Sequence, residues 1–243
     1  MEGKMTWDYI VPPSMCDTDG RLGIPNAFDL FMDMAGQHSS AIGNGVRQIM
    51  KQGRFWITTK TLIRFYKRPG IDQTVQLSTW PENVKKLTGL KGNRDYEVRS
   101  MEGELLLEGK TEWTMLDRSA NSYVDLRTVY PEDFEFCEDI ACPQNYFKIK
   151  DNFTEQPFAS YKVLNLDTDF VGHMNNVAYV RAFANCFSAE EWRKLSISEL
   201  EIHFRRQCFE GDTLDFTTRS GPDGYTEVRG SVSGETKVMI RYK

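Results

Sequence analysis

The sequence has few histidines and no regular cysteine pattern. Three histidines occur in 243 residues, and the five cysteines include no repeated pair of the kind that binds zinc (Cys16, Cys137, Cys142, Cys186 and Cys208). We therefore expect free thiols, no metal ion and no cofactor. An odd number of cysteines in a chain of this length is typical of a reducing compartment, so we expect a cytoplasmic protein.

The chain also lacks a basic excess and long apolar runs. Its formal net charge is -5 and its pI is about 5.4. These values argue against a nucleic-acid binder, because binding to a polyanion needs a basic surface. No apolar stretch reaches 18 residues, and no apolar run of seven follows the N-terminal residues. We therefore predict no membrane association.

The first half of the chain is typical of a helix followed by a sheet. Apolar residues recur every three or four positions over 25–50, as on an amphipathic helix, and Gly43 and Gly45 are expected to break it. Runs rich in β-branched and aromatic residues follow at 54–65, 74–80, 90–99 and 105–116. This order predicts an α+β domain with an antiparallel meander.

The second half repeats this order after a segment without apolar periodicity. Residues 127–157 are rich in proline and acidic side chains, which predicts a linker between domains at 1–126 and 158–243. Beyond it, a strand at 159–166 precedes a polar loop and a helix. Strands are then expected at 197–206, 213–219, 225–233 and 236–242. The economical architecture is a sheet wrapped around one long helix, duplicated in tandem.

Polar and titratable groups crowd the loop before this second helix. The loop reads DTDFVGHMNN and ends at Asn175 and Asn176, of which either is a plausible N-cap. A carboxylate, an imidazole and the backbone N–H groups at a helix start together supply what acyl transfer needs. The same residues also fit a capped helix after a polar loop, with no catalytic role.

A resemblance to a known family favours the catalytic interpretation of this loop over that of a capped helix alone. DTDFVGHMNNVAY resembles the D-x-N-x-H-V-N-N-x-x-Y signature of fatty acyl-acyl carrier protein (acyl-ACP) thioesterases. The first half resembles that family's first domain, with the pairs Thr79-Trp80 and Arg94-Asp95 and the later Trp113, and LEIHFRRQCFEGD resembles the strand that carries its Glu-Cys pair. The resemblance implies two tandem hotdog domains, each with an antiparallel sheet around a long helix.

The resemblance also assigns the site residues. Asp169 matches the family's catalytic aspartate and His173 its catalytic histidine. The family's Asn falls on Val171, and its Glu falls on Gln207, which can position water or the aspartate but cannot act as a base. Val171, Asn175 and Asn176 are expected beside the substrate, with Asn175 or backbone N–H groups replacing the missing amide.

Three further residues allow more than one interpretation. Cys208 keeps the family's cysteine and could act as a nucleophile, but its place among apolar residues on one face of a strand favours a structural thiol. His38 and His203 stand among polar neighbours, and structural or solvated roles are expected for both.

The implied substrate needs an apolar tunnel and a carrier-docking surface. The family lodges the acyl chain in the first domain, where Phe31 and Met34 are available either to line a tunnel or to fill the core. Acyl carrier proteins are acidic, so a basic surface is expected to dock one. Two groups qualify: Arg64, Lys67 and Arg68, which we favour, and Lys85, Lys86, Lys91 and Arg94.

The predicted function is hydrolysis of fatty acyl-ACP, which ends fatty acid synthesis by releasing the free acid. One alternative is a hotdog thioesterase that acts on acyl-coenzyme A. A second is a non-catalytic acyl-binding hotdog protein, to which the substitutions at Val171 and Gln207 lend support. Acyl carrier protein is the expected partner, and the chain is expected to be a monomer or a homodimer.

Overall fold

The computed structural model describes residues 3–84 and 89–243, which form two compact units, Met1–Gln144 and Asn145–Lys243. Each unit is an antiparallel sheet with helices on one face, so the predicted α+β class is confirmed. Within the described residues, no helix is long and apolar enough to cross a membrane. The division between the units falls inside the segment 127–157, whose role as a linker stays a prediction.

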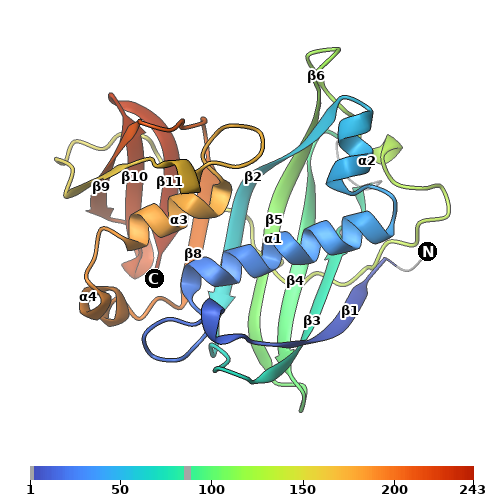
Figure 1. Ribbon diagram of the computed structural model, residues 1–243, viewed down its shortest axis with the longest axis horizontal. Coiled ribbons are helices and arrows are strands. Elements are labelled where there is room, and N and C mark those ends of the chain that lie inside the picture. The colour runs from blue at the N-terminus through green and yellow to red at the C-terminus, as the bar shows by residue number, and fades with distance from the viewer. Residues whose placement is uncertain (1–2, 85–88) are drawn as a thin grey trace. The chain divides into compact units, whose positions relative to one another are not determined.

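The first unit consists of a sheet crossed by one long helix (Figure 1). Its sheet order is β1-β3-β4-β5-β2, with the short β6 paired to the end of β5. The helices are α1 (Ile24–Ala41) and α2 (Val46–Lys51). The strands are β1 (Met5–Ile10), β2 (Arg54–Phe65), β3 (Thr74–Pro81), β4 (Gly92–Ser100), β5 (Leu105–Asp117) and β6 (Ser122–Tyr123).

The second unit repeats this plan with a shorter helix. Its sheet order is β8-β11-β10-β9-β7. The helices are α3 (Asn176–Ala184), which has 9 residues against the 18 of α1, and α4 (Ala189–Lys194). The strands are β7 (Ala159–Lys162), β8 (Glu199–Phe204), β9 (Thr213–Ser220), β10 (Thr226–Val232) and β11 (Glu235–Tyr242).

Most predicted elements are present within a few residues, and the helix predicted over 25–50 is broken between α1 and α2 as expected. Strand β1 was not predicted, and one predicted strand is shorter than expected. The strand predicted at 159–166 ends at Lys162, because the Asp167 carboxylate accepts the Leu164 N–H at 2.8 Å and draws the chain into a 3-10 turn.

Helix α1 packs on the sheet of the first unit through fully buried Phe31 and Met34. The Phe31 ring stacks on Tyr96 of β4, with centroids 4.4 Å apart. This close approach depends on Gly109 of β5. A Cβ there would lie 2.5 Å from the Phe31 ring and 2.4 Å from the Leu62 carbonyl oxygen. In the second unit α3 packs similarly, through Phe183 against Phe216 of β9.

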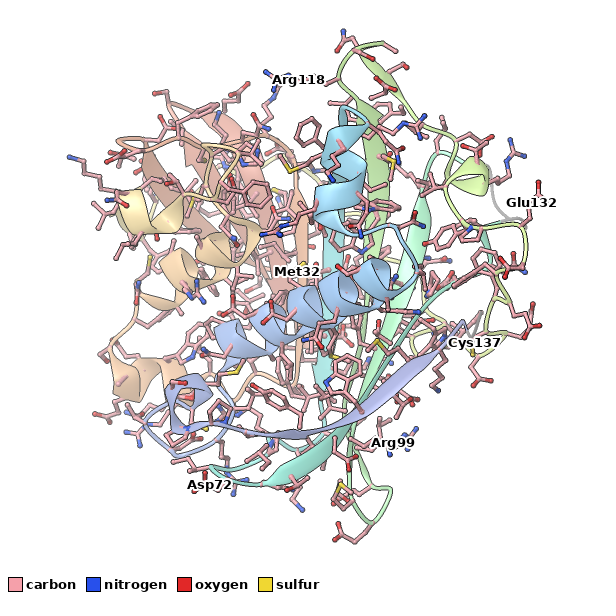
Figure 2. All side chains as sticks on the ribbon, turned by 45° about the vertical axis from the view of Figure 1, so that its right-hand side comes forward. Met32, Asp72, Arg99, Arg118, Glu132 and Cys137 are labelled. Carbon is pink, nitrogen blue, oxygen red and sulfur yellow. The ribbon has the colours of Figure 1, made fainter. Side chains whose placement is uncertain are left out.

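The C-terminal part of the segment 131–144 covers the sheet face of the first unit that lies opposite α1. The Trp80 indole donates to the Asp139 carbonyl at 2.8 Å, and the Lys110 amine donates to the Gln144 carbonyl. Cys142, which belongs to this segment, is fully buried. Figure 2 shows another of its cysteines, Cys137, at the margin of the first unit.

The segment 145–153 covers the corresponding face of the second unit. The Phe147 N–H donates to Glu201 at 2.9 Å, and Arg219 donates to the Lys150 carbonyl at 2.8 Å. The Arg241 guanidinium lies 3.2 Å from the centre of the Phe147 ring. Each half of the predicted linker is thus bound to the sheet of its own unit.

We expect Gly109→Ala to lower the free energy of unfolding by about 1–3 kcal/mol, because the methyl group would overlap Phe31 and the Leu62 carbonyl. Gly36→Ala is the control: Gly36 lies in α1 with no atom within 4 Å of an added Cβ, and the change should stabilise by roughly 0.5–1 kcal/mol. Urea unfolding of both variants measures the difference. Equal stability of the two variants would contradict the close approach.

Candidate active site

The loop between β7 and α3 is a tight turn held by its own backbone. The Asp169 N–H donates to the His173 carbonyl at 3.0 Å, and the Gly172 N–H donates to the Asp169 carbonyl at 3.0 Å. Gly172 has a φ of +89°, which a residue with a side chain rarely adopts. The local sequence therefore folds the turn so that positions 169 and 173 face each other across its base.

This turn brings the Asp169 carboxylate and the His173 imidazole together. His173 Nδ1 lies 3.7 Å from Asp169 Oδ2, and the two side chains are 25% and 20% exposed. Both groups are therefore partly sheltered but open to a ligand. At this distance, a small movement of either side chain forms a direct hydrogen bond between them.

The backbone at position 171 holds the other oxygen of the aspartate. The Val171 N–H donates to Asp169 Oδ1 at 2.9 Å, and this orients the carboxylate. The Val171 side chain stands where the resembling family has an Asn, and it is 46% exposed. The neighbouring Phe170 is 74% exposed. The contact to Asp169 thus needs no amide side chain at this position.

Asp167 and Asn175 shape the turn from its two ends. The Asp167 carboxylate accepts from Leu164 N–H and from the Tyr161 hydroxyl, and its carbonyl accepts from Asn175 N–H at 2.8 Å. The Asn175 side chain caps α3 by accepting the Val177 N–H at 2.8 Å. Both side chains are therefore engaged in the fold, and Asn175 rather than Asn176 is the N-cap.

Three backbone N–H groups between residues 168 and 177 have no protein acceptor. Among the described residues, the N–H groups of Phe170, at the exposed tip of the turn, and of His173 and Asn176 make no hydrogen bond, whereas those of Gly172, Met174 and Val177 do. Asn176 is the first residue of α3, where the helix dipole adds partial positive charge. Such N–H groups are suited to binding a developing negative charge on oxygen.

Gln207 and Cys208 lie on the chain that runs beside the turn. The Met174 N–H donates to the Cys208 carbonyl at 2.8 Å. Gln207 is exposed, and in the part of the chain that the structure describes its side chain bonds neither Asp169 nor His173. Cys208 is fully buried, its N–H donates to the Tyr179 hydroxyl, and burial raises the pKa of its thiol. The protonated thiol is a poor nucleophile.

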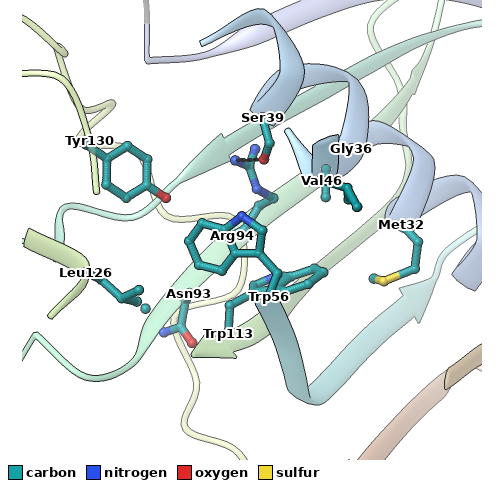
Figure 3. Close-up of a pocket in the computed structure, with 12 residues that line it drawn as sticks. Met32, Gly36, Ser39, Val46, Trp56, Asn93, Arg94, Trp113, Leu126 and Tyr130 are labelled. Atoms are coloured by element: carbon teal, nitrogen blue, oxygen red, sulfur yellow. Dashed lines mark hydrogen bonds between the residues drawn. The ribbon is translucent and has the colours of Figure 1, made fainter. Parts of the chain in front are cut away.

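A pocket that the sequence did not predict lies in the first unit, between α1 and its sheet (Figure 3). Phe31 and Met34, the residues expected near the acyl chain, are fully buried and do not line it. The lining comes from helices, strands and a loop and comprises Met32, Ala35, Gly36, Ser39, Val46, Trp56, Gly92, Asn93, Arg94, Trp113, Leu126 and Tyr130. No contiguous sequence signal marks such a set.

The basic residues expected to dock a carrier protein are largely paired with carboxylates. Arg64 donates to Glu108 at 3.2 Å. Arg68 bridges Asp17, at 2.7 Å, and Asp19, which ties it into the loop before α1. Lys67 forms an exposed pair with Glu104 at 3.3 Å. Lys67 is therefore the most available of the three to a partner.

The second basic group is not a continuous surface. Lys85 and Lys86 lie outside the described residues. Lys91 pairs with Glu112 at 2.9 Å. The expectation that Arg94 belongs to a surface was wrong: it is 5% exposed, because its position in β4 directs it toward α1. Charge alone suggested a solvated residue there.

His38 and His203 are both buried, so of the two roles expected for them the structural one fits and the solvated one does not. His38 Nδ1 lies 2.9 Å from Arg94 Nη1, and His203 is hydrogen-bonded to Glu201. Within residues 3–84 and 89–243, no three His, Cys, Asp or Glu side chains are grouped so that they could hold a metal ion.

Comparison with known proteins relates both units to one family. Residues 2–130 match the model of the acyl-ACP thioesterase N-terminal domain, and residues 150–242 match that of the C-terminal domain. An oleoyl-acyl carrier protein thioesterase of Arabidopsis thaliana is 25% identical over 194 residues, which cover 75% of this chain and 52% of the relative. An oleoyl-acyl carrier protein thioesterase of Coriandrum sativum is 22% identical over 218 residues, which cover 82% of this chain and 58% of that relative. The chain thus spans about half the length of the curated relatives it matches.

Solved structures with the same fold cover nearly the whole chain. An acyl-ACP thioesterase from Bacteroides thetaiotaomicron superimposes with a TM-score of 0.86 at 20% identity, covering 99% of this chain and 97% of that one. The 12:0-ACP thioesterase from Umbellularia californica gives a TM-score of 0.77 at 15% identity, covering 99% and 96%. These likenesses confirm the tandem hotdog fold.

We expect Cys208 to react slowly with iodoacetamide in the folded protein, since its thiol is fully buried. Cys16 and Cys137 are partly exposed and serve as internal controls. Mass spectrometry of peptides alkylated before and after unfolding in urea measures each rate. Labelling of native Cys208 as fast as that of Cys137 would show a reactive thiol instead.

Proposed function

Because the chain belongs to the acyl-ACP thioesterase family, we propose that it hydrolyses the thioester between a fatty acyl group and acyl carrier protein. The products are the free fatty acid and the carrier thiol. The observation that carries the proposal is the pairing of Asp169 with His173 on a turn whose backbone orients the carboxylate. The acidic carrier protein is the proposed partner.

Asp169 acts on the carbonyl carbon of the thioester, as a general base toward water or as the attacking nucleophile. Its Oδ1 is fixed by the Val171 N–H, so Oδ2, which faces His173, is the oxygen available for this role. His173 polarises the reacting group and donates a proton to the departing thiolate. The Gln207 amide, which is exposed beside the turn, can hold water but cannot remove a proton from it.

The unpaired N–H groups of His173 and Asn176 supply the oxyanion site. When the carbonyl carbon becomes tetrahedral, its oxygen gains negative charge, and preorganised N–H donors lower the energy of that state. Both groups lie at the end of the turn that carries the imidazole, one of them at the start of α3. The turn therefore carries the base, the proton donor and the oxyanion donors together.

The cytoplasm is the proposed location, on the grounds of the free thiols. The plant relatives are named as chloroplastic proteins.

We expect Asp169→Ala to lower kcat by about 10²–10⁴-fold, because the variant has no carboxylate to act on the thioester. Thiol release from acyl-ACP substrates of graded chain length measures the effect. Glu210→Ala is the matched control, since it removes an exposed carboxylate from the neighbouring loop and should leave kcat unchanged. Full activity of Asp169→Ala would refute the assignment.

The same assay identifies the carrier. Acyl-coenzyme A esters of equal chain length, tested in parallel, are expected to turn over more slowly than the ACP substrates. Preference for the coenzyme A esters would make the chain an acyl-CoA thioesterase. Recovery of bound acyl ligand without turnover on either carrier would make it an acyl-binding protein.

Lys67→Glu should raise the KM for acyl-ACP by about fivefold at low salt, the equivalent of roughly 1 kcal/mol for an exposed charge pair. The effect should fade at high salt, because exposed charges are screened. Arg118→Glu, an equal charge change at an exposed position of the same unit (Figure 2), is the control. Equal KM values for the two variants would place the docking surface elsewhere.

A further inference from the structure

The segment that follows β8 leaves the sheet of the second unit beside the loop that precedes α3. Strand β8 ends at Phe204, and the Arg206 N–H still donates to the Lys237 carbonyl of β11 at 3.2 Å. In the part of the chain that the structure describes, the Gln207 N–H makes no hydrogen bond. The backbone at Gln207 therefore receives no support from regular secondary structure.

One hydroxyl group of α3 holds this backbone on both sides of Gln207. The Tyr179 hydroxyl accepts the Cys208 N–H at 2.9 Å and donates to the Arg206 carbonyl at 3.4 Å. A phenol can make both bonds, because its oxygen accepts while its O–H donates. The Tyr179 side chain is buried, and burial raises the pKa of its hydroxyl, so the proton needed for the second bond stays in place.

The same segment is joined to the turn that carries His173. The Met174 N–H donates to the Cys208 carbonyl at 2.8 Å, so Cys208 is bonded to α3 through its N–H and to the residue after His173 through its carbonyl. Gln207, one residue earlier, is thereby placed beside the turn. Among the described residues, no hydrogen bond holds its exposed side chain, so the position of the amide depends on the backbone that carries it.

Helix α3 connects the two parts of the candidate site. Its N-cap, Asn175, ends the turn, and Tyr179 lies about one turn of helix further along. The Tyr179 ring packs edge-on against that of Phe204, the last residue of β8, with centroids 5.8 Å apart, which fixes the direction of the hydroxyl. The helix thus holds the turn at its first residues and the Gln207 backbone one turn later.

We propose that Tyr179 is a positioning residue for hydrolysis, which holds the Gln207 amide beside the water that attacks the acyl carbon. This role rests on the proposed function and goes beyond it, because Tyr179 is buried and acts only through Gln207. A hydroxyl that served the fold alone would change only the free energy of unfolding. A hydroxyl that acts through the Gln207 amide changes kcat and leaves KM unaltered, because the amide contributes to the reaction of water and not to binding of the thioester.

The test is a double-mutant cycle of Tyr179→Phe and Gln207→Ala in the full chain, followed as kcat and KM for acyl-ACP hydrolysis. Each single change should lower kcat about tenfold with KM unchanged, since a small misplacement of a positioned group is enough for such a loss. The double variant should be no slower than Gln207→Ala, because the effect of Tyr179 passes through the amide. Losses that multiply in the double variant, or full kcat in Gln207→Ala, would overturn the proposal.

Tyr225→Phe is the matched control. The Tyr225 hydroxyl donates to Glu199 at 2.8 Å in the same unit, and its ring lies against Phe147 of the covering segment 145–153, on the sheet face away from α3. Its loss should leave kcat unchanged. A chain that hydrolyses no thioester at all would refute the proposed function and this role with it, whereas hydrolysis with multiplying losses would refute the role of Tyr179 alone.

Thermal melting checks that Tyr179→Phe is folded. If it is not, amide hydrogen exchange of the unmodified protein and kcat of Gln207→Ala decide. The Cys208 amide, bonded to Tyr179, should exchange at least about tenfold more slowly than the neighbouring Gln207 amide, which has no acceptor in the part of the chain that the structure describes. Equal exchange of the two amides would refute the hydrogen bond on which the role of Tyr179 depends.

Discussion

The close approach of Phe31 to Gly109 sets the geometry of the first unit. With no side chain on Gly109, α1 lies low enough on the sheet for Phe31 to stack on Tyr96. The same helix then brings the His38 and Ser39 side chains within hydrogen-bond distance of Arg94. A helix held further away by a methyl group would break these bonds and widen the pocket. The absence of a side chain at Gly109 therefore determines both how Phe31 packs in the core and how α1 meets the buried Arg94.

The two units use their helices for different purposes. In the first unit, α1 buries its apolar face in the core, and other residues of the helix line a pocket. In the second unit, α3 has half the length, and its importance lies at its first residue, where the turn of Asp169 and His173 ends. The duplicated plan of helix on sheet thus supports a pocket in one unit and the turn of Asp169 and His173 in the other.

The fold could be predicted from sequence because its signals are local and periodic. The break after α1 follows from two glycines, and the strands follow from alternating apolar residues. Strand β1 escaped prediction because it is short and because Ile10 places an apolar side chain on its exposed face, although the burial itself alternates along the strand.

The predictability of the candidate site depends on where its residues lie along the chain. The residues of the turn are contiguous, so their juxtaposition could be foreseen. The pocket could not be, because residues from α1, α2, three strands and a later loop meet only in the folded unit. Arg94 was misjudged for the same reason: its surroundings come from α1, far away in the sequence.

The covering segments have a consequence for synthesis on the ribosome. When the last strand of the first unit has emerged, Trp80 and Lys110 still face water, because their partners at Asp139 and Gln144 follow later. A nascent chain therefore holds an assembled but uncovered sheet until residues 131–144 are translated. Domains of growing chains generally fold as units from the N-terminus, so completion of this unit lags behind its last strand by that interval. During it, this face of the sheet is open to solvent.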